Sequence, residues 1–317
     1  MGFDSLLGNQ RLKERLSSAL DKGQPSHSYL ITGPVGSGKH SLATLLAAAL
    51  QCTGDHKPCC RCNPCRKVMS GIHPDVITVD DTEKKNVSVA LIREAISDLY
   101  IRPNEGNKKI YLIPRAKDMR LEAQNALLKC IEEPPPYGVF LFLAEHSEQL
   151  LTTIRSRCVE LRLSPLPDSL LEAELSRRFP DADPATHSAA ILRSDGYLGQ
   201  AISLMGEGAA LLPQTEDFVR AYCTGNPAPL LSVLVPMEKL KREQLKAIFA
   251  EWLMLISAAL RVRSGLPSVH PLCGQLARSR STAALLRSSK AIREAMELTD
   301  ANVGAGHICG GLSILLR

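Results

Sequence analysis

Residues 28–40 read Ser-Tyr-Leu-Ile-Thr-Gly-Pro-Val-Gly-Ser-Gly-Lys-His, and this stretch decides the fold. A short apolar run typical of a buried strand leads into a glycine-rich loop, which ends in lysine and opens a helical pattern. Such a loop wraps its backbone amides around phosphate, and the N-terminus of the following helix adds partial positive charge. The sequence therefore predicts a phosphate-binding loop formed by Gly33, Gly36, Ser37, Gly38 and Lys39.

The loop departs from that of a hydrolytic enzyme. Position 40 should carry Ser or Thr to bind Mg²⁺, but it is His40, and a neutral imidazole is a poor ligand for a hard cation. Ser41 lies about 100° further around the helix and cannot replace it. The strand expected at residues 110–113 should run into a carboxylate, but it continues with Pro114, and Asp118 is several residues away. We therefore predict a lost Mg²⁺ site, at most weak ATP or ADP binding and negligible hydrolysis; the alternative is a loop that keeps its shape without any nucleotide.

Five of the ten cysteines lie in one short segment. Cys59, Cys62 and Cys65 are spaced as two successive C-x-x-C steps, and Cys52 precedes them by seven residues. Four thiolates form a closed tetrahedral site for structural zinc, with no open position for chemistry. We predict zinc bound by these four cysteines, against the alternative of unliganded thiols. Cys60 is the surplus thiol, because the even two-residue spacing favours Cys59 as the ligand.

The first half of the chain alternates short apolar runs with helical patterns, which is typical of an α/β domain with a parallel sheet. Pro165 and Pro167 interrupt this alternation, because proline removes a backbone donor and disfavours helix just before it. A domain boundary is expected there. The expected strands are Ser28–Thr32, Val76–Val79, Lys109–Ile113 and Val139–Leu143, and helices are expected from Lys39, from Ala90 and over Ala123–Ile131.

Helical patterns dominate the second half, and no strand is expected after about Leu212. The expected helices cover Asp168–Arg178, Ala185–Arg193, Glu238–Val262 and Arg278–Leu298. We thus predict an α/β domain at residues 1–165 with a zinc module at 52–65, a small helical domain at 166–208 and an all-α domain at 209–317.

The composition is that of a globular protein with more than one core. A chain of 317 residues exceeds the usual size of a single core, and 44% hydrophobic with 22% charged residues excludes a disordered or fibrous protein. Residues 1–22 lack the apolar run of a secretory signal or membrane span, so we expect a cytoplasmic protein with no membrane partner. The net charge of +5 needs no explanation beyond solubility.

Several short strings resemble the AAA+ clamp-loader subunits of bacterial DNA polymerase III, the gamma/tau and delta-prime kinds. Their order and spacing match over about the first 165 residues. The resemblance implies an AAA+ phosphate-loop domain followed by a helical lid and a helical collar through which subunits form a ring. The strings are Ser-His-Ser-Tyr-Leu at 26–30, His-Pro-Asp at 73–75, Asn-Ala-Leu-Leu-Lys at 125–129, Glu-Glu-Pro-Pro at 132–135 and Thr-Ile-Arg-Ser-Arg-Cys at 153–158.

In that family the Ser-Arg-Cys arginine enters the ATP site of the neighbouring subunit as an arginine finger, and Arg157 matches it; a structural ion pair is the simpler alternative. Family members that hydrolyse ATP carry a sensor arginine after the lid glycine. This chain reads Gly-Tyr-Leu-Gly-Gln at 196–200, with Gly199 or Gln200 where that arginine would fall. The strand ending in Ala144 also runs into Glu145, an altered sensor. The resemblance thus implies a non-hydrolysing, delta-prime-like subunit.

The implied partners are the gamma/tau and delta subunits and, through the assembled complex, the sliding clamp and primer-template DNA. The main alternative is a gamma/tau-like ATPase motor that uses Lys39. A zinc-dependent nucleic-acid binder unrelated to replication is a further alternative, which an aromatic content of 4% disfavours because few side chains could stack on bases.

Overall fold

The computed structural model describes residues 2–81, 83–84, 86–208, 210–268 and 270–316. The chain divides into two compact units. One comprises residues 1–166 together with 197–199, and the other comprises residues 167–196 and 200–317.

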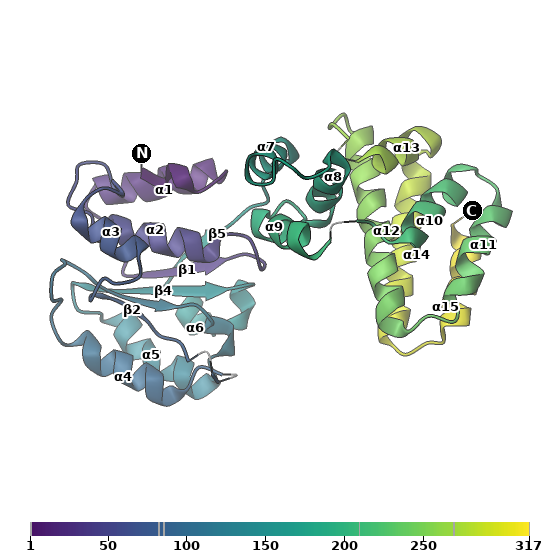
Figure 1. Ribbon diagram of the computed structural model, residues 1–317. Helices are drawn as coiled ribbons and strands as arrows, with labels where there is room; N and C mark the ends of the chain where they lie inside the picture. Colours follow the sequence, from purple (N-terminus) through teal and green to yellow (C-terminus); the bar gives the residue numbers. More distant parts are fainter. Residues whose placement is uncertain (1, 82, 85, 209, 269, 317) are drawn as a thin grey trace. The chain divides into compact units, whose positions relative to one another are not determined.

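A five-stranded parallel sheet forms the centre of the first unit (Figure 1). The strand order is β2-β3-β4-β1-β5, and every neighbouring pair is parallel. Two expected strands, β1 and β3, were predicted to the residue. Strand β5 was not predicted, because Glu160 and Arg162 interrupt its apolar pattern. The strands are β1 (Ser28–Thr32), β2 (Val76–Thr78), β3 (Lys109–Ile113), β4 (Gly138–Ala144) and β5 (Val159–Arg162).

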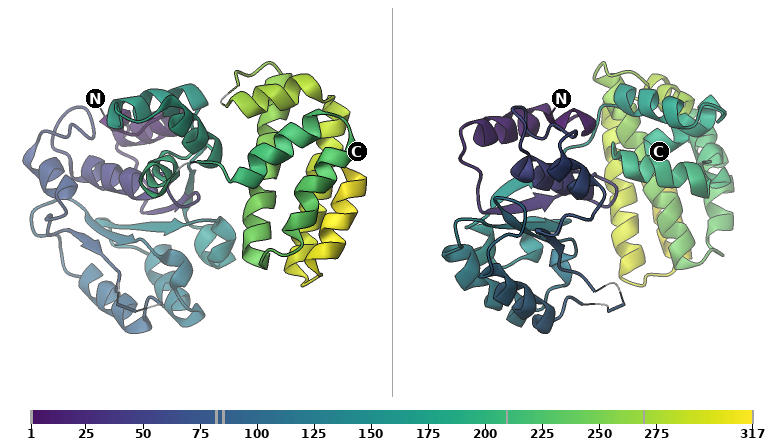
Figure 2. Two further views of the ribbon diagram at one scale, coloured as in Figure 1. Left: turned by 45° about the vertical axis from the view of Figure 1, so that its right-hand side comes forward. Right: turned by 60° about the vertical axis from the view of Figure 1, so that its left-hand side comes forward.

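Helices cover both faces of this sheet, and the sheet lies between them in each view of Figure 2. Successive side chains of a strand point to opposite faces, so Tyr29 and Ile31 join one core and Leu30 joins the other. The first core is covered by α1 (Gln10–Asp21), α2 (Lys39–Gln51) and α3 (Asn63–Met69), and the second by α4 (Val89–Leu99), α5 (Leu121–Glu132) and α6 (Thr152–Arg155). Short 3₁₀ turns lie at η1 (Gly2–Ser5), η2 (Ala116–Asp118) and η3 (Ser147–Gln149). This parallel sheet between helices fits the AAA+ phosphate-loop fold.

The second unit is helical throughout its described residues. Proline begins several of its helices, a position where the missing backbone N–H costs nothing. The helices are α7 (Asp168–Arg178), α8 (Pro184–Arg193), α9 (Leu198–Glu207, whose first two residues belong to the first unit), α10 (Pro213–Cys223), α11 (Pro227–Met237), α12 (Arg242–Arg263), α13 (Pro271–Ser279), α14 (Thr282–Asp300) and α15 (Ala305–Leu315).

The core of this unit is built around Trp252, which is fully buried. Its ring stacks on Phe218 with centroids 4.0 Å apart, and Phe249 meets it edge-on. Two of the expected helices differ from those in the structure. The helix expected from Glu238 begins at Arg242, because residues 238–241 turn after α11. The helix expected over 278–298 is two helices, separated where the Ser281 side chain accepts the N–H of Ala284 at 3.2 Å.

Among the described residues, no helix combines the length and the apolar character needed to cross a membrane.

Candidate functional site

The glycine-rich loop joins β1 to α2 and has the backbone shape that its sequence predicts. Gly36 and Gly38 have φ angles of 77° and 93°, in the left-handed region that favours glycine. Lys39 begins α2, and its Nζ donates to the carbonyl oxygens of Gly33 at 2.6 Å and Pro34 at 2.8 Å. These two hydrogen bonds leave one of the three N–H donors of the lysine for a phosphate. The lysine is thus held by its own loop.

His40 lies at the position where a hydroxyl would bind Mg²⁺. The residue is exposed, but partial burial of its ring, followed by the charge of Lys39, lowers its pKa. The imidazole is therefore neutral at neutral pH. A neutral nitrogen ligand suits zinc or copper better than Mg²⁺, so the structure supplies no substitute for the missing hydroxyl at this position.

Cations hold the carboxylates around the loop. Pro114 and Arg115 follow β3, where a hydrolytic site places its metal-binding acid. The Arg115 Nε donates to Asp80 Oδ1 at 2.8 Å, and its Nη1 lies 3.9 Å from Asp118. Glu145 pairs with Lys117, and this hydrogen bond holds the pKa of the Glu145 carboxyl below its usual range. These acids are thus engaged in ion pairs.

Gly199 contacts the phosphate loop directly, a contact that the sequence did not indicate. Its N–H donates to the carbonyl of Gly36 at 2.9 Å. A Cβ added at position 199 would lie 2.6 Å from the Gly36 Cα, closer than such atoms approach in proteins. A side chain at this position therefore requires the loop to move. The same position is the one where the family resemblance expects a sensor arginine.

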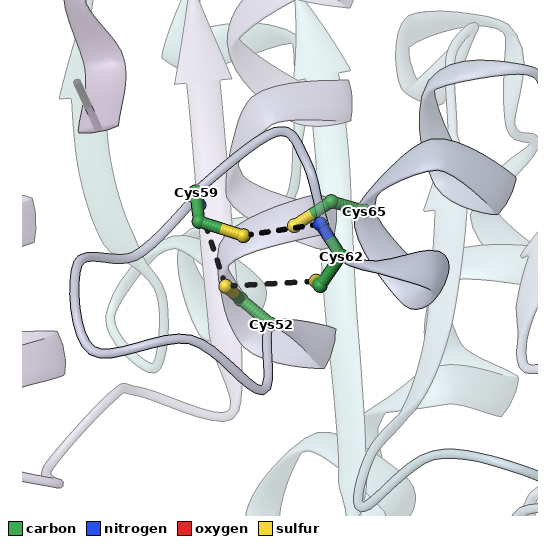
Figure 3. Close-up of side chains that lie close together, drawn as sticks. All are labelled: Cys52, Cys59, Cys62 and Cys65. Carbon is green, nitrogen blue, oxygen red and sulfur yellow. Dashed lines mark hydrogen bonds between the residues drawn. The ribbon is translucent and has the colours of Figure 1, made fainter.

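The four cysteines of the expected zinc module come together beside the loop helix. Cys52 follows α2, Cys59 and Cys62 lie in the next loop, and Cys65 is in α3. Figure 3 shows the four side chains converging, and all four sulfur atoms lie within 4.8 Å of one another. A tetrahedral zinc with Zn–S bonds of about 2.3 Å needs sulfurs about 3.8 Å apart. The donor set and its spacing fit zinc.

Backbone N–H groups point at these sulfurs, but burial still raises the pKa of the Cys52 and Cys65 thiols. The N–H groups of Gly54 and Cys59 point at Cys52 Sγ, at 3.4 and 3.3 Å. Burial raises the pKa of Cys62, but N–H donors from Thr53 and Cys65 outweigh it and lower the pKa to about 6. Such donors stabilise negative charge on sulfur.

Cys60, the surplus thiol, lies outside the cluster. Its φ is 56°, which is uncommon for a residue with a side chain, and the residue is exposed. The geometry groups Cys59, and not Cys60, with the other three cysteines.

Arg157 lies on the exposed turn between α6 and β5. Its Nη1 donates to the carbonyl of Thr153 at 2.8 Å, and its Nη2 lies 2.8 Å from Glu132 Oε1 at the end of α5. The two side chains are 38% and 44% exposed. The guanidinium is thus held on its own chain by an ion pair that water reaches. Sequence reasoning assigned no role to Glu132.

Asp75 is a second residue whose role the sequence did not show. Its carboxylate is fully buried and accepts the N–H groups of Asn104, Glu105 and Gly106, at 2.6, 2.9 and 2.8 Å. It fixes the loop that leads into β3. The His-Pro-Asp string at 73–75 therefore has a structural reason.

The chain is similar to one known family and to several individual proteins. A family model described as "DNA polymerase III, delta subunit" matches residues 8–167. The delta' subunits of Bacillus subtilis and Pseudomonas aeruginosa are each 34% identical, over 57% and 59% of this chain and 54% and 58% of their own length. The tau subunit of Escherichia coli is 31% identical over 66% of this chain and 33% of its own length. The chain thus spans about half of these delta' relatives and a third of the tau relative.

Proposed function

The chain belongs to the family described as DNA polymerase III, delta subunit, and from this premise we propose that it acts as a non-hydrolysing, delta-prime-like subunit of a clamp loader. Its task is to complete a ring with gamma/tau and delta subunits. The assembled ring places the sliding clamp on primer-template DNA. The matched delta' and tau relatives support membership in such a complex.

The phosphate loop gives the main support for the proposal that this chain does not hydrolyse ATP. Lys39 is bound to two carbonyls of its own loop, and the residue after it is a neutral histidine. Phosphoryl transfer needs a lysine on the phosphates and a Mg²⁺ ion that bridges them. This loop engages its lysine with two of its own carbonyls and has no hydroxyl at position 40 for the ion. Gly199, hydrogen-bonded to Gly36, replaces the sensor arginine of a hydrolytic member.

Arg157 is the residue through which this chain would act on ATP held by a neighbouring subunit. It is exposed and lies on a turn fixed by α6 on one side and β5 on the other. A guanidinium brought to the γ-phosphate neutralises the charge that develops in the transition state, which accelerates phosphoryl transfer by about 10³ to 10⁵ in well-studied NTPases. The chain then contributes to catalysis across an interface.

The cysteine module has a structural role in this proposal. Cys52, Cys59, Cys62 and Cys65 would hold zinc in a closed site, which leaves no coordination position for a substrate. The binding energy of such a site, about 10 kcal/mol or more, is sufficient to order a short loop that buries little of its own surface.

Two measurements test this function. The isolated chain should show no ATP turnover that depends on Lys39; turnover lost in Lys39→Ala would instead establish a gamma/tau-like motor. In a loader reconstituted with gamma/tau and delta subunits, Arg157→Ala should slow hydrolysis at the adjoining site by about 10³-fold or more while the complex still assembles. Arg155→Ala, which removes a cation two residues away, is the matched control and should leave turnover unchanged. Equal turnover in both variants would remove the finger role.

A further inference from the structure

A groove runs between helix α1 and strand β5 of the first unit. Two hollows of about 530 and 740 Å³ share Arg11, Arg15 and Leu161 in their walls, so they form one continuous depression. Apolar side chains of Leu161 and Val159 lie along it, with Lys22 at one end. We refer to it as the α1–β5 groove. Its lining residues belong to neither the phosphate loop nor the cysteine cluster, and the proposed function assigns it nothing.

The cations of the groove have no ionic partners of their own. Arg11 and Arg15 are four residues apart, which places them on one face of α1. Lys22 follows the last residue of this helix, and Arg162 lies on the strand side. All four are exposed. Within the part of the chain that the structure describes, none of them forms an ion pair.

The acids of the groove do not neutralise these cations. Glu14 accepts a hydrogen bond from the Gln10 side chain at 2.9 Å, and Glu160 accepts one from Thr32 Oγ1 at 3.1 Å. Arg11, Arg15 and Lys22 thus lie on the helix side beside one carboxylate, that of Glu14. Arg162 and Glu160 alternate with Leu161 on the strand, so their side chains point to the other face of the sheet. The field along the groove is positive and favours an anionic partner.

The strand side of the groove is an open sheet edge. Strand β5 is the last strand and pairs only with β1. The N–H of Leu163 donates to Thr32 at 2.9 Å, and alternate residues of a parallel strand bond to the same neighbour, so Leu161 also faces β1. Glu160 and Arg162 therefore turn their backbone N–H and C=O groups away from the sheet. An added strand could pair with these groups.

The free edge has a defined end. The next outward N–H, that of Ser164, donates to the Asn9 side chain at 2.8 Å, so an added strand cannot pair beyond this point. The open stretch is short, and its backbone hydrogen bonds alone would bind weakly. Charge must supply much of the affinity.

The spacing of the cations matches that of an extended chain. Arg11 and Arg15 are four residues apart on a helix, or about 6 Å along its axis. Side chains on one face of a β-strand repeat about every 6.7 Å. We propose that the α1–β5 groove binds an extended acidic segment of a partner protein, which adds to β5 as a further strand. Acidic side chains at every second residue of this segment then lie against Arg11 and Arg15. A nucleic acid would satisfy the cations but would leave the strand edge without partners, so the geometry favours the peptide.

The test uses the full chain and a labelled peptide of alternating Glu and Val, followed by fluorescence anisotropy. Saturable binding that weakens as salt is raised is expected. Arg15→Glu should weaken it by about tenfold. Lys13→Glu makes the same charge change on the same helix but lies outside the groove, and should change binding by less than about twofold. Arg11→Glu provides a second variant should Arg15→Glu fail to fold, as judged by circular dichroism.

A second peptide separates strand addition from general attraction. N-methylation of alternate backbone amides removes hydrogen-bond donors but leaves the charges, so it should weaken binding by about tenfold if the peptide pairs with β5. Equal binding of the methylated peptide, equal loss in Lys13→Glu, or no peptide binding would each overturn the proposal. The proposal would also be overturned if an oligothymidylate bound more tightly than the peptide and Arg15→Glu abolished that binding. The groove would then be a nucleic-acid surface.

Discussion

Asp75 shows how one buried charge can be stable when the backbone surrounds it. Burial alone would raise the pKa of its carboxyl, but the N–H groups of Asn104, Glu105 and Gly106 outweigh burial and hold the pKa below the usual range. A group with a depressed folded-state pKa stabilises the protein above its unfolded pKa and loses this effect as the pH falls through the folded value. The charged carboxylate therefore stabilises this loop at neutral pH, and acid removes that stabilisation.

Asp75→Asn should lower the free energy of unfolding at neutral pH by about 1 to 3 kcal/mol, because a neutral amide accepts these donors less well. The difference from wild type should shrink as the pH falls from about 3.9, the ordinary pKa of an aspartate, towards the lower folded-state pKa at which Asp75 itself becomes neutral. Urea unfolding at several pH values measures it. Asp181→Asn, at an exposed position, is the control and should show no such pH dependence. A difference that stays constant with pH would refute the charge argument.

The contact between Glu132 and Arg157 bears on the proposed finger. The guanidinium must leave Glu132 before it can reach a nucleotide on another subunit. Ion pairs this exposed are worth little, so the restraint is modest.

Glu132→Gln should therefore raise the ATP turnover of the assembled loader at low nucleotide concentration, by up to about fivefold. The kinetic constants kcat and KM of the reconstituted complex check this. Glu133→Gln makes the same charge change one residue further on, where no ion pair to Arg157 is formed among the described residues, and it should have no effect. If Arg157→Ala slows ATP turnover but Glu132→Gln leaves it unchanged, Arg157 acts as the finger and its ion pair with Glu132 does not restrain it.

At the scale of elements, the sequence predicted what depends on local pattern. Strands β1 and β3 were found to the residue, because buried central strands are continuous apolar runs. The four cysteines were grouped because their spacing is local. Strand β5 was missed, since an edge strand with polar residues resembles a loop. The contact of Gly199 with Gly36 joins residues that are far apart in sequence, so no local signal could announce it.

Gly199→Ala tests that contact. A glycine in a helix is usually stabilised by replacement with alanine, by up to about 1 kcal/mol. At position 199 the new Cβ would meet the backbone of Gly36, so we expect a loss of about 1 to 3 kcal/mol instead. Gly206, in the same helix α9, has open space around its Cβ direction, and Gly206→Ala should stabilise. The unfolding temperatures of the two variants test this expectation. A higher unfolding temperature for Gly199→Ala would show that the loop moves freely.

At the scale of the whole molecule, two units with separate cores share one chain. The cysteine cluster belongs to the first unit. The single tryptophan of the sequence, Trp252, lies at the centre of the second. Metal content therefore reports on the first unit, and tryptophan fluorescence reports on the second.

Metal analysis of the purified protein should find about one zinc per chain. Removing it with a strong chelator should lower the unfolding temperature of the first unit, followed by circular dichroism, because metal binding and folding are coupled. The midpoint of the Trp252 fluorescence transition should stay unchanged. Protein that is folded and free of metal as purified would contradict the zinc assignment, and a parallel shift of both signals would show that the units unfold together.

The hydrogen bond between Asn9 and Ser164 has a consequence for inheritance. It places the start of α1 next to the exit from the last strand, so the matched segment at residues 8–167 enters and leaves at one point on its surface. A segment with adjoining ends can be exchanged between genes as one cassette without cutting its sheet.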